Sequence, residues 1–326
     1  MSVRPQSDTP NGTIEREGAS TVLRFERSLA HGLDEVWAAL VAPDAWLGHF
    51  VEPLVDGDTY RLMFEGLEMA GKVVELEPPN VLAFTWGNDV DSGEAVLRFE
   101  LTPTGDRGTR LVFTATSDSR DFLAEGAAGW QGYVDALEAA ADGDTIEKSQ
   151  AGWAKFRDAY AEHFAVSPSL GAISEVDSER AITFRRLLAH APAVVWSALT
   201  EPAELATWLS ACRLDPHVGG TVRFGFGNEA AATGTVIEFH PCIRLTYSWS
   251  SPSATESMLR WDLADGPAGG IWLTLTHTVS SAENGDDLLA GWHLHLDALR
   301  EALDGRDPGW REGAFEPMLA LYARMH

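Results

Sequence analysis

The sequence predicts an α+β fold built twice, as two tandem domains that each wrap a curved antiparallel sheet around a long C-terminal helix. Two short helices are expected after the first strand of each domain. Three repeated segments carry this prediction: LAHGLDEVWAAL (29–40) returns as LAHAPAVVWSAL (188–199), LEPPNVLAFTW (76–86) as FHPCIRLTYSW (239–249), and GWQGYVDALEAAADG (129–143) as GWHLHLDALREALDG (291–305). Their period is much longer than that of a solenoid repeat, so each copy is expected to be a whole domain with its own core.

The order of elements is the same in both copies. Each opens with a strand of alternating character (22–27 and 181–186), followed by a helix. Pro43 and Pro202 are expected to end that helix and to start a second short one, because proline fits only the first helical turn. Short alternating runs joined by turns then predict an antiparallel meander, such as VLAFTW followed by AVLRFEL, and RLTYSW followed by SMLRWDL.

A long amphipathic helix is expected to close each sheet. In the second copy its apolar stripe recurs at spacings of three and four residues, at Leu288, Trp292, His295, Leu299 and Leu303. A further helical segment follows in both copies, and it brings Tyr160 and Tyr322 into register.

The predicted boundaries follow from these elements. Residues 1–19 are expected to be a disordered leader, 20–165 the first domain, 166–179 a linker with Ser, Pro and Gly, and 180–326 the second domain.

Charge and composition exclude several classes of partner. The net charge of −25 argues against nucleic acid and anionic membrane surfaces, which need clustered Lys and Arg. No run of about 18 apolar residues predicts a membrane span. Cys212 and Cys242 have no counterparts in the first copy, so we expect free thiols in a reducing cytoplasm.

The repeated motifs resemble the AHSA1-like branch of the START/Bet v 1-like (SRPBCC) superfamily, whose helix-grip fold encloses a cavity. The segments that carry the resemblance are APAVVWSALTEPAELATWL, GTVIEFHPCIRLTYSW, MLRWDL, GGIWLTLTHT and GWHLHLDALREAL. The second copy matches closely, whereas the first diverges and has Ala115 where the second has His277. The resemblance implies that function depends on what occupies the cavity. Tandem AHSA1-like arrangements are similar to proteins of actinobacterial natural-product loci, including enediyne self-resistance proteins.

Two histidines are the candidate catalytic residues if the protein is an enzyme. Alternation along GGIWLTLTHT puts His277 on an apolar face, and His295 lies on the stripe of the covering helix. Both are expected to face the second cavity, where a histidine can relay a proton near neutral pH. The alternative is a hydrogen-bonded core histidine, which the lack of a nearby orienting carboxylate favours.

Other histidines are expected to be structural. His293 and His295 stand two apart on a helix and point to different faces, so they do not form a metal site. His31 and His190 are kept at the loop before the first helix, which is a turn rather than a cavity wall. The sequence contains no metal-binding spacing, phosphate loop or dinucleotide fingerprint, and no metal or cofactor is expected.

Large aromatic side chains dominate the predicted inward faces. They either fill the core or form a stacking surface for a planar ligand, and Trp46 and Trp208 are expected at cavity mouths. The candidate ligand-binding residues are Trp46, Phe84, Trp86, Phe113, Trp130, Tyr133, Trp208, Phe224, Tyr247, Trp249, Trp261, His277, Trp292 and His295.

The function that we infer from the sequence is cytoplasmic binding of an apolar, polycyclic or polyketide-type small molecule, in sequestration, self-resistance or an accessory role in natural-product biosynthesis. One alternative is a polyketide cyclase or dehydratase that uses His277 and His295. A second is a partner protein that activates the Hsp90 ATPase, as the family resemblance implies.

Overall fold

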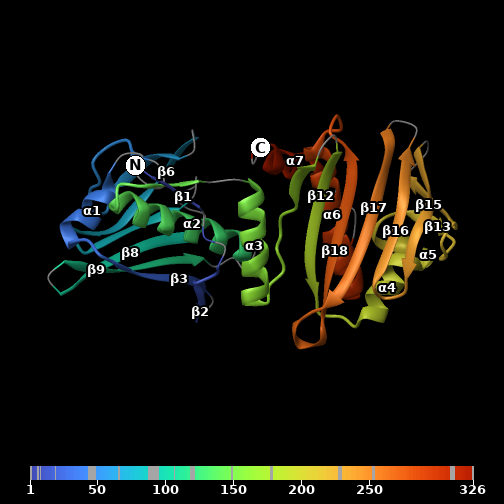
Figure 1. The fold of residues 1–326 in the computed structure, drawn as a ribbon, viewed down its shortest axis with the longest axis horizontal. Helices are drawn as coiled ribbons and strands as arrows, with labels where there is room; N and C mark the ends of the chain where they lie inside the picture. Colours follow the sequence, from blue (N-terminus) through green and yellow to red (C-terminus); the bar gives the residue numbers. More distant parts are fainter. Residues whose placement is uncertain are drawn as a thin grey trace. The chain divides into compact units, whose positions relative to one another are not determined.

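Each half of the chain folds into an eight-stranded antiparallel sheet with one long helix against it (Figure 1). The computed structural model describes the chain except residues 1, 6, 8, 19, 43–48, 65–66, 87–94, 106, 118–121, 148–149, 177–178, 227–229, 252–253, 309–312 and 325–326. The chain divides into two units, Met1–Phe164 and Ala165–His326.

The strand order in the first unit is β2-β3-β9-β8-β7-β6-β5-β4. Its sheet strands are β2 (Thr13–Glu17), β3 (Ser20–Leu29), β4 (His49–Phe50), β5 (Thr59–Phe64), β6 (Leu67–Glu77), β7 (Val81–Trp86), β8 (Ala95–Thr104) and β9 (Gly108–Ser117). Its helices are α1 (Leu33–Val41), α2 (Leu123–Ala141) and α3 (Gln150–Phe164). A separate parallel pair joins β1 (Val3–Pro5) to β10 (Thr145–Glu147).

The second unit repeats this topology, with the order β11-β12-β18-β17-β16-β15-β14-β13. Its strands are β11 (Ala172–Val176), β12 (Glu179–Leu188), β13 (Ala211–Leu214), β14 (Thr221–Phe226), β15 (Ala230–His240), β16 (Arg244–Ser251), β17 (Ala254–Asp265) and β18 (Ile271–Ser280). Its helices are α4 (Pro192–Thr200), α5 (Pro202–Trp208), α6 (Gly285–Leu303) and α7 (Phe315–Ala323), with a short 3-10 turn η1 (Pro267–Gly269).

The α+β class and the antiparallel meander predicted from the sequence are confirmed. The two short helices after the first strand are present in the second unit, where Pro202 opens α5. In the first unit α1 is present, and the segment that follows Pro43 lies outside the described residues.

Each sheet is bent at the same place by a β-bulge. The register between β6 and β7 shifts between Val73 and Glu75, and that between β15 and β16 shifts between Val236 and Glu238. The extra residue faces outward in both sheets, since Val74 is 50% and Ile237 44% exposed. A bulge bends its strand and increases the local twist, which helps each sheet to curve around its helix.

The expected leader and linker differ from the structure. β1 and β2 lie within residues 1–19, and β11 lies within 166–179. β2 and β11 are equivalent edge strands that pair with β3 and β12. β2 is polar and exposed except at Ile14, and in β11 the two exposed residues, Ser174 and Glu175, are neighbours, so neither strand shows the alternation that marks a half-buried strand. The repeat of Gly-Thr-Ile (12–14) as Gly-Ala-Ile (171–173) was the available signal.

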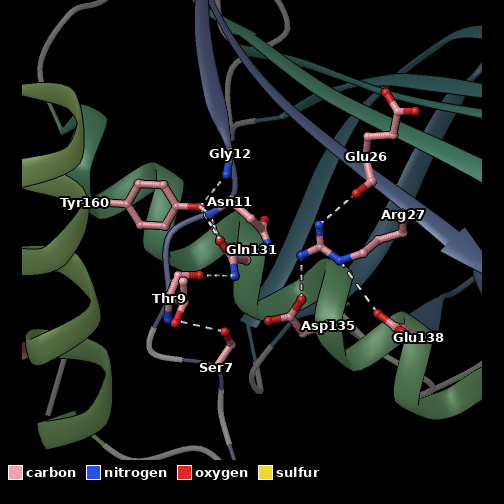
Figure 2. Close-up of polar contacts among 10 residues, drawn as sticks. All are labelled: Ser7, Thr9, Asn11, Gly12, Glu26, Arg27, Gln131, Asp135, Glu138 and Tyr160. Atoms are coloured by element: carbon pink, nitrogen blue, oxygen red, sulfur yellow. Dashed lines mark hydrogen bonds and ion pairs between the residues drawn. The ribbon is translucent and has the colours of Figure 1, made fainter.

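A buried tyrosine, Tyr160, joins two helices of the first unit to the segment before the edge strand β2 (Figure 2). The Tyr160 hydroxyl, from α3, accepts hydrogen bonds from the backbone N–H groups of Gly12 (2.9 Å) and Asn11 (3.2 Å) and donates to Gln131 Oε1. Gln131 lies on α2, and its amide nitrogen donates to Thr9 O (3.1 Å). One hydroxyl therefore joins the last helix, the long helix and the segment before the sheet.

The second unit has the same arrangement. The hydroxyl of Tyr322, from α7, accepts from the N–H of Gly171 (2.9 Å) and contacts Nδ1 of His293 on α6 (2.9 Å). His293 stands at the position of Gln131, and Gly171 at that of Gly12. Both glycines approach an aromatic ring so closely that an added Cβ would lie 2.5 Å from Phe25 or Phe184.

We expect Tyr160→Phe and Tyr322→Phe each to destabilise its own unit by about 1–3 kcal/mol, because a buried backbone N–H loses its acceptor. Chemical denaturation followed by far-UV circular dichroism would measure the effect, and each substitution should move the transition of one unit only. Unchanged midpoints for both variants would contradict a stabilising role of the hydroxyls.

The second unit should lose stability on acidification through His293. Burial, and then the charges of Arg186 and Arg300, lower the pKa of His293 to about 3, whereas an unfolded histidine titrates near 6.5. Between these two pKa values the unfolded chain binds more protons than the folded chain does. The contribution of His293 to the free energy of unfolding is therefore fully present above pH about 6.5, and below that pH it falls by up to about 1.4 kcal/mol per pH unit.

The matched control is His293→Gln, because the first unit holds its tyrosine with a glutamine at this position. The variant should keep the fold and lose stability less steeply between pH 6.5 and 4, measured as denaturation midpoints at each pH. Parallel curves for the two proteins would show that His293 does not cause the acid sensitivity.

Candidate ligand-binding site

A pocket of about 170 Å³ lies in the second unit, between the sheet and α6. Trp249 from β16 and His277 from β18 form its sheet side, and Leu209, directly after α5, borders one end. The remaining lining residues all come from the first three turns of α6: Asp287, Leu288, Gly291, Trp292 and His295.

Aromatic packing explains why this space is small. Trp292 makes edge-to-face contacts with Trp249 and Trp261, at centroid distances of 6.3 and 5.7 Å. Phe224 stacks on Trp249 at 5.0 Å, and Trp208 packs edge-on against Trp261 at 6.0 Å. These rings fill most of the space that the sheet and α6 enclose, and the pocket is what they leave between Trp249 and α6.

A directed chain of hydrogen bonds holds His277 at the inner wall. The Trp292 indole N–H donates to His277 Nδ1 (3.0 Å) and can only donate, so the proton of the neutral ring is on Nε2. The Nε2–H then donates to Ser257 Oγ (2.9 Å), whose hydroxyl donates to the carbonyl of Trp249 (3.1 Å). These hydrogen bonds fix the orientation of the His277 ring and its tautomer, and they join Trp292, His277, Ser257 and Trp249 in the pocket wall.

The charge state of His277 follows from its burial. The side chain is 3% exposed, and desolvation lowers its pKa to about 4, only partly opposed by the charge of Glu283. A group with this pKa is neutral at pH 7. Because both ring nitrogens are engaged, the geometry favours a structural histidine over a general base.

His295 is held by another backbone contact. Its Nδ1–H donates to the carbonyl oxygen of Trp208 (3.2 Å), and burial lowers the pKa of the imidazole. The ring packs edge-on against Trp292 at 6.0 Å. The structure therefore brings His277 and His295 to one pocket, with Trp292 between them.

The predicted stripe on the covering helix is rotated from the observed one. Leu288, His295 and Leu303 are half-buried, whereas Leu289, His293 and Leu296 are buried with Trp292 and Leu299. The sequence alone cannot show that α7 covers one side of α6 and buries His293 against Tyr322. The half-buried side, with Leu288 and His295, faces the pocket instead.

Asp287 and Gly291 line the pocket but are not among the ligand-binding residues predicted from the sequence. They stand four residues apart, and His295 follows four further on, so the three share one helix face. That spacing was the signal that could have found them. Asn284, the N-cap of α6, donates its side-chain N–H to Asp287 Oδ2 (3.0 Å) and so holds the carboxylate at the rim.

Four other predicted site residues of the second unit are core residues. Trp208 is 3% exposed, and its indole N–H donates to Ala198 O (2.9 Å), so it does not stand at a cavity mouth. The Trp261 indole N–H donates to the hydroxyl of buried Tyr247 (3.2 Å), and buried Phe224 supports Trp249 from behind. Trp249 and Trp292 are the predicted tryptophans that border the pocket.

Four predicted residues of the first unit are joined by ring contacts, and Phe84 reaches them through Phe99. Phe113 and Trp130 lie 5.6 Å apart, and Trp130 also contacts Trp86 (5.0 Å) and Tyr133 (5.9 Å). Phe84 is fully buried at the other end of this cluster. Trp46 lies outside the described residues.

The paired loop histidines are structural. His31 Nε2 lies 2.5 Å from Asp142, and His190 Nε2 lies 3.0 Å from Asp304. Each aspartate is the C-cap of its long helix, α2 or α6. The same pair therefore fastens the loop before the first short helix in both units.

Three further features concern the part of the chain that the structure describes. Cys212 and Cys242 are free cysteines. Within that part of the chain no group of three or more His, Cys, Asp or Glu side chains is arranged to hold a metal ion. None of the described helices combines the length and apolar character needed to cross a membrane.

A known protein family matches both copies of the repeat. The family model of Activator of Hsp90 ATPase homolog 1-like proteins matches residues 31–142 and 189–304. No curated protein matches the chain.

Several solved structures are similar to parts of the chain. CalU16 from Micromonospora echinospora is 22% identical over 47% of this chain and 90% of its own, with a TM-score of 0.39. A protein from Bordetella parapertussis is 26% identical over 48% and 93%, with a TM-score of 0.39. DynU16, from the dynemicin biosynthetic locus, is 19% identical over 86% and 98%, with a TM-score of 0.33.

We expect His277 to stay in the neutral Nε2–H form from pH 8 down to about pH 5, because its pKa is lowered to about 4. Long-range ¹H–¹⁵N NMR of the imidazole nitrogens, assigned with a His277→Gln variant, would show the tautomer and its titration. A midpoint near pH 6.5, or a protonated Nδ1, would contradict the hydrogen-bond chain.

Proposed function

Because the chain belongs to the family of Activator of Hsp90 ATPase homolog 1-like proteins, we propose that its second unit binds an apolar small molecule through a planar ring. The pocket between Trp249, Trp292 and α6 carries this proposal. It combines two indole rings with the side chain of Leu288 and a few fixed polar groups, as small-molecule sites commonly do.

The pocket volume sets the size of the enclosed group. Pockets that enclose a drug-sized ligand measure roughly 300–1,000 Å³, whereas a cavity of about 150 Å³ holds one benzene ring. At about 170 Å³ the pocket takes a single ring, and the rest of a polycyclic or polyketide-type molecule would lie at the rim, near Asp287 and Leu288. Each ring contact would add about 0.5–1.5 kcal/mol beyond area burial.

We propose uptake without chemical conversion, as in sequestration. The support is the state of His277, which is neutral and uses both ring nitrogens inside the wall. A cyclase or dehydratase would need a base that titrates near the working pH, and His277 does not have that property. Polyketide-type molecules of natural-product pathways are the first ligands to test for this role.

Gly291 offers a substitution that fills the pocket without disturbing the core. A Cβ added at Gly291 meets no atom within 4 Å, and the residue lines the pocket. Gly291→Leu should abolish ring binding while leaving the stability of α6 equal or higher, because leucine is the better helix former by about 0.8 kcal/mol. Titration calorimetry with a set of aromatic and polyketide ligands, alongside thermal unfolding, would measure both effects.

Gly129 provides the matched control, because it is the equivalent position on α2 and also has open space around it. Gly129→Leu should leave ligand affinity unchanged. If Gly129→Leu abolished binding and Gly291→Leu did not, the site would lie in the first unit. Failure of every ligand to bind the wild-type chain at millimolar concentration would refute the proposed function.

A further inference from the structure

The side chains that line the pocket in the second unit carry negative charge and no positive charge. Its lining contains two indole rings and one carboxylate, that of Asp287, but no Lys or Arg. Both lining histidines have lowered pKa values, so neither His277 nor His295 adds a positive charge at pH 7. Aromatic ring faces carry partial negative charge, so the charged and aromatic side chains of the lining favour a cation.

The two tryptophans form two walls of an aromatic box. Trp249 and Trp292 meet at 65° with their centroids 6.3 Å apart. Phe224 stacks on one face of Trp249, so the opposite side of that ring borders the pocket. Rings at a steep angle around a small space are the arrangement that binds quaternary ammonium groups.

The fold places the Asp287 carboxylate at the rim of the pocket. Asp287 lies in the first turn of α6, and the Asn284 side chain donates to one of its oxygens (3.0 Å). In the first unit Glu125 stands at the equivalent place, is 7% exposed, and precedes Trp130 as Asp287 precedes Trp292. Both units thus keep a carboxylate five residues before the tryptophan of the long helix.

We propose that the pocket recognises a ligand bearing an ammonium group, which the rings of Trp249 and Trp292 and the carboxylate of Asp287 hold together. The inference rests on the proposed function and specifies its ligand class as an apolar molecule with a cationic amine. The net charge of −25 adds a long-range attraction that concentrates such cations near the protein.

The test compares two probes of one shape. Phenyltrimethylammonium and tert-butylbenzene differ in a charged nitrogen against a neutral carbon, and each would be titrated into the full chain. The indole N–H resonances of Trp249 and Trp292, assigned with Trp→Phe variants, report binding at the pocket. We expect the cation to bind at least about 5-fold more tightly than the hydrocarbon, in line with one cation–π contact and one exposed ion pair.

Asp287→Asn should remove the share of that difference that comes from the ion pair, keep the share that comes from the rings, and leave binding of tert-butylbenzene unchanged. The control is Asp286→Asn, because Asp286 lies in the same first turn but not in the pocket lining. Both variants remove one negative charge from the first turn of α6, and thermal unfolding of each would show any difference in helix stability. A loss with Asp287→Asn alone would support the proposal.

The outcomes separate the two proposals. Equal affinity for the two probes, or an equal loss with both aspartate variants, would overturn cation recognition and leave ring binding in place. Failure of both probes to shift the indole resonances would overturn cation recognition and count against the proposed function as well.

Discussion

The hydroxyl of one buried tyrosine in each unit sets where the terminal helix, the long helix and the edge of the sheet can lie. Tyr160 and Tyr322 each accept a backbone N–H from a glycine at 2.9 Å and contact a polar side chain of α2 or α6. A buried N–H left without an acceptor costs about 1–3 kcal/mol, so these contacts resist sliding of the helix. The glycines are required because any larger residue would collide with a neighbouring ring.

This contact decides which side of α6 faces the ligand. The contact between His293 and Tyr322 fixes the rotation of α6 about its own axis. With that rotation, Leu288, Gly291 and His295 lie on the side of α6 that lines the pocket. Trp292 lies between the two sides and donates to His277, which links helix rotation to the pocket wall. A substitution in the tyrosine contact would therefore change the shape of the pocket even though Tyr322 does not line it.

The copies share a scaffold but differ where the pocket forms. In the first unit Ala115 and Tyr133 replace His277 and His295, and Trp130 packs against Trp86, Phe113 and Tyr133. Without an imidazole at position 115, Trp130 has no equivalent of the acceptor that orients Trp292. The duplication thus kept the contacts that fold each unit, while the residues around the tryptophan of the long helix diverged.

The repeat by itself determined the two-domain α+β architecture and the order of strands and helices, because periodicity and turn residues act over short stretches of chain. It also placed His277, Trp292 and His295 on faces that meet. Tertiary structure alone decided that Trp208, Phe224, Tyr247 and Trp261 are core rather than wall, and that the space left measures about 170 Å³. Ring packing and helix rotation depend on contacts between segments far apart in the chain, which no local pattern encodes. The edge strands β2 and β11 and the pocket residues Asp287 and Gly291 have only weak signals in the sequence, a short repeat and a spacing of four residues, and the assembled sheets and helices show what those signals mean.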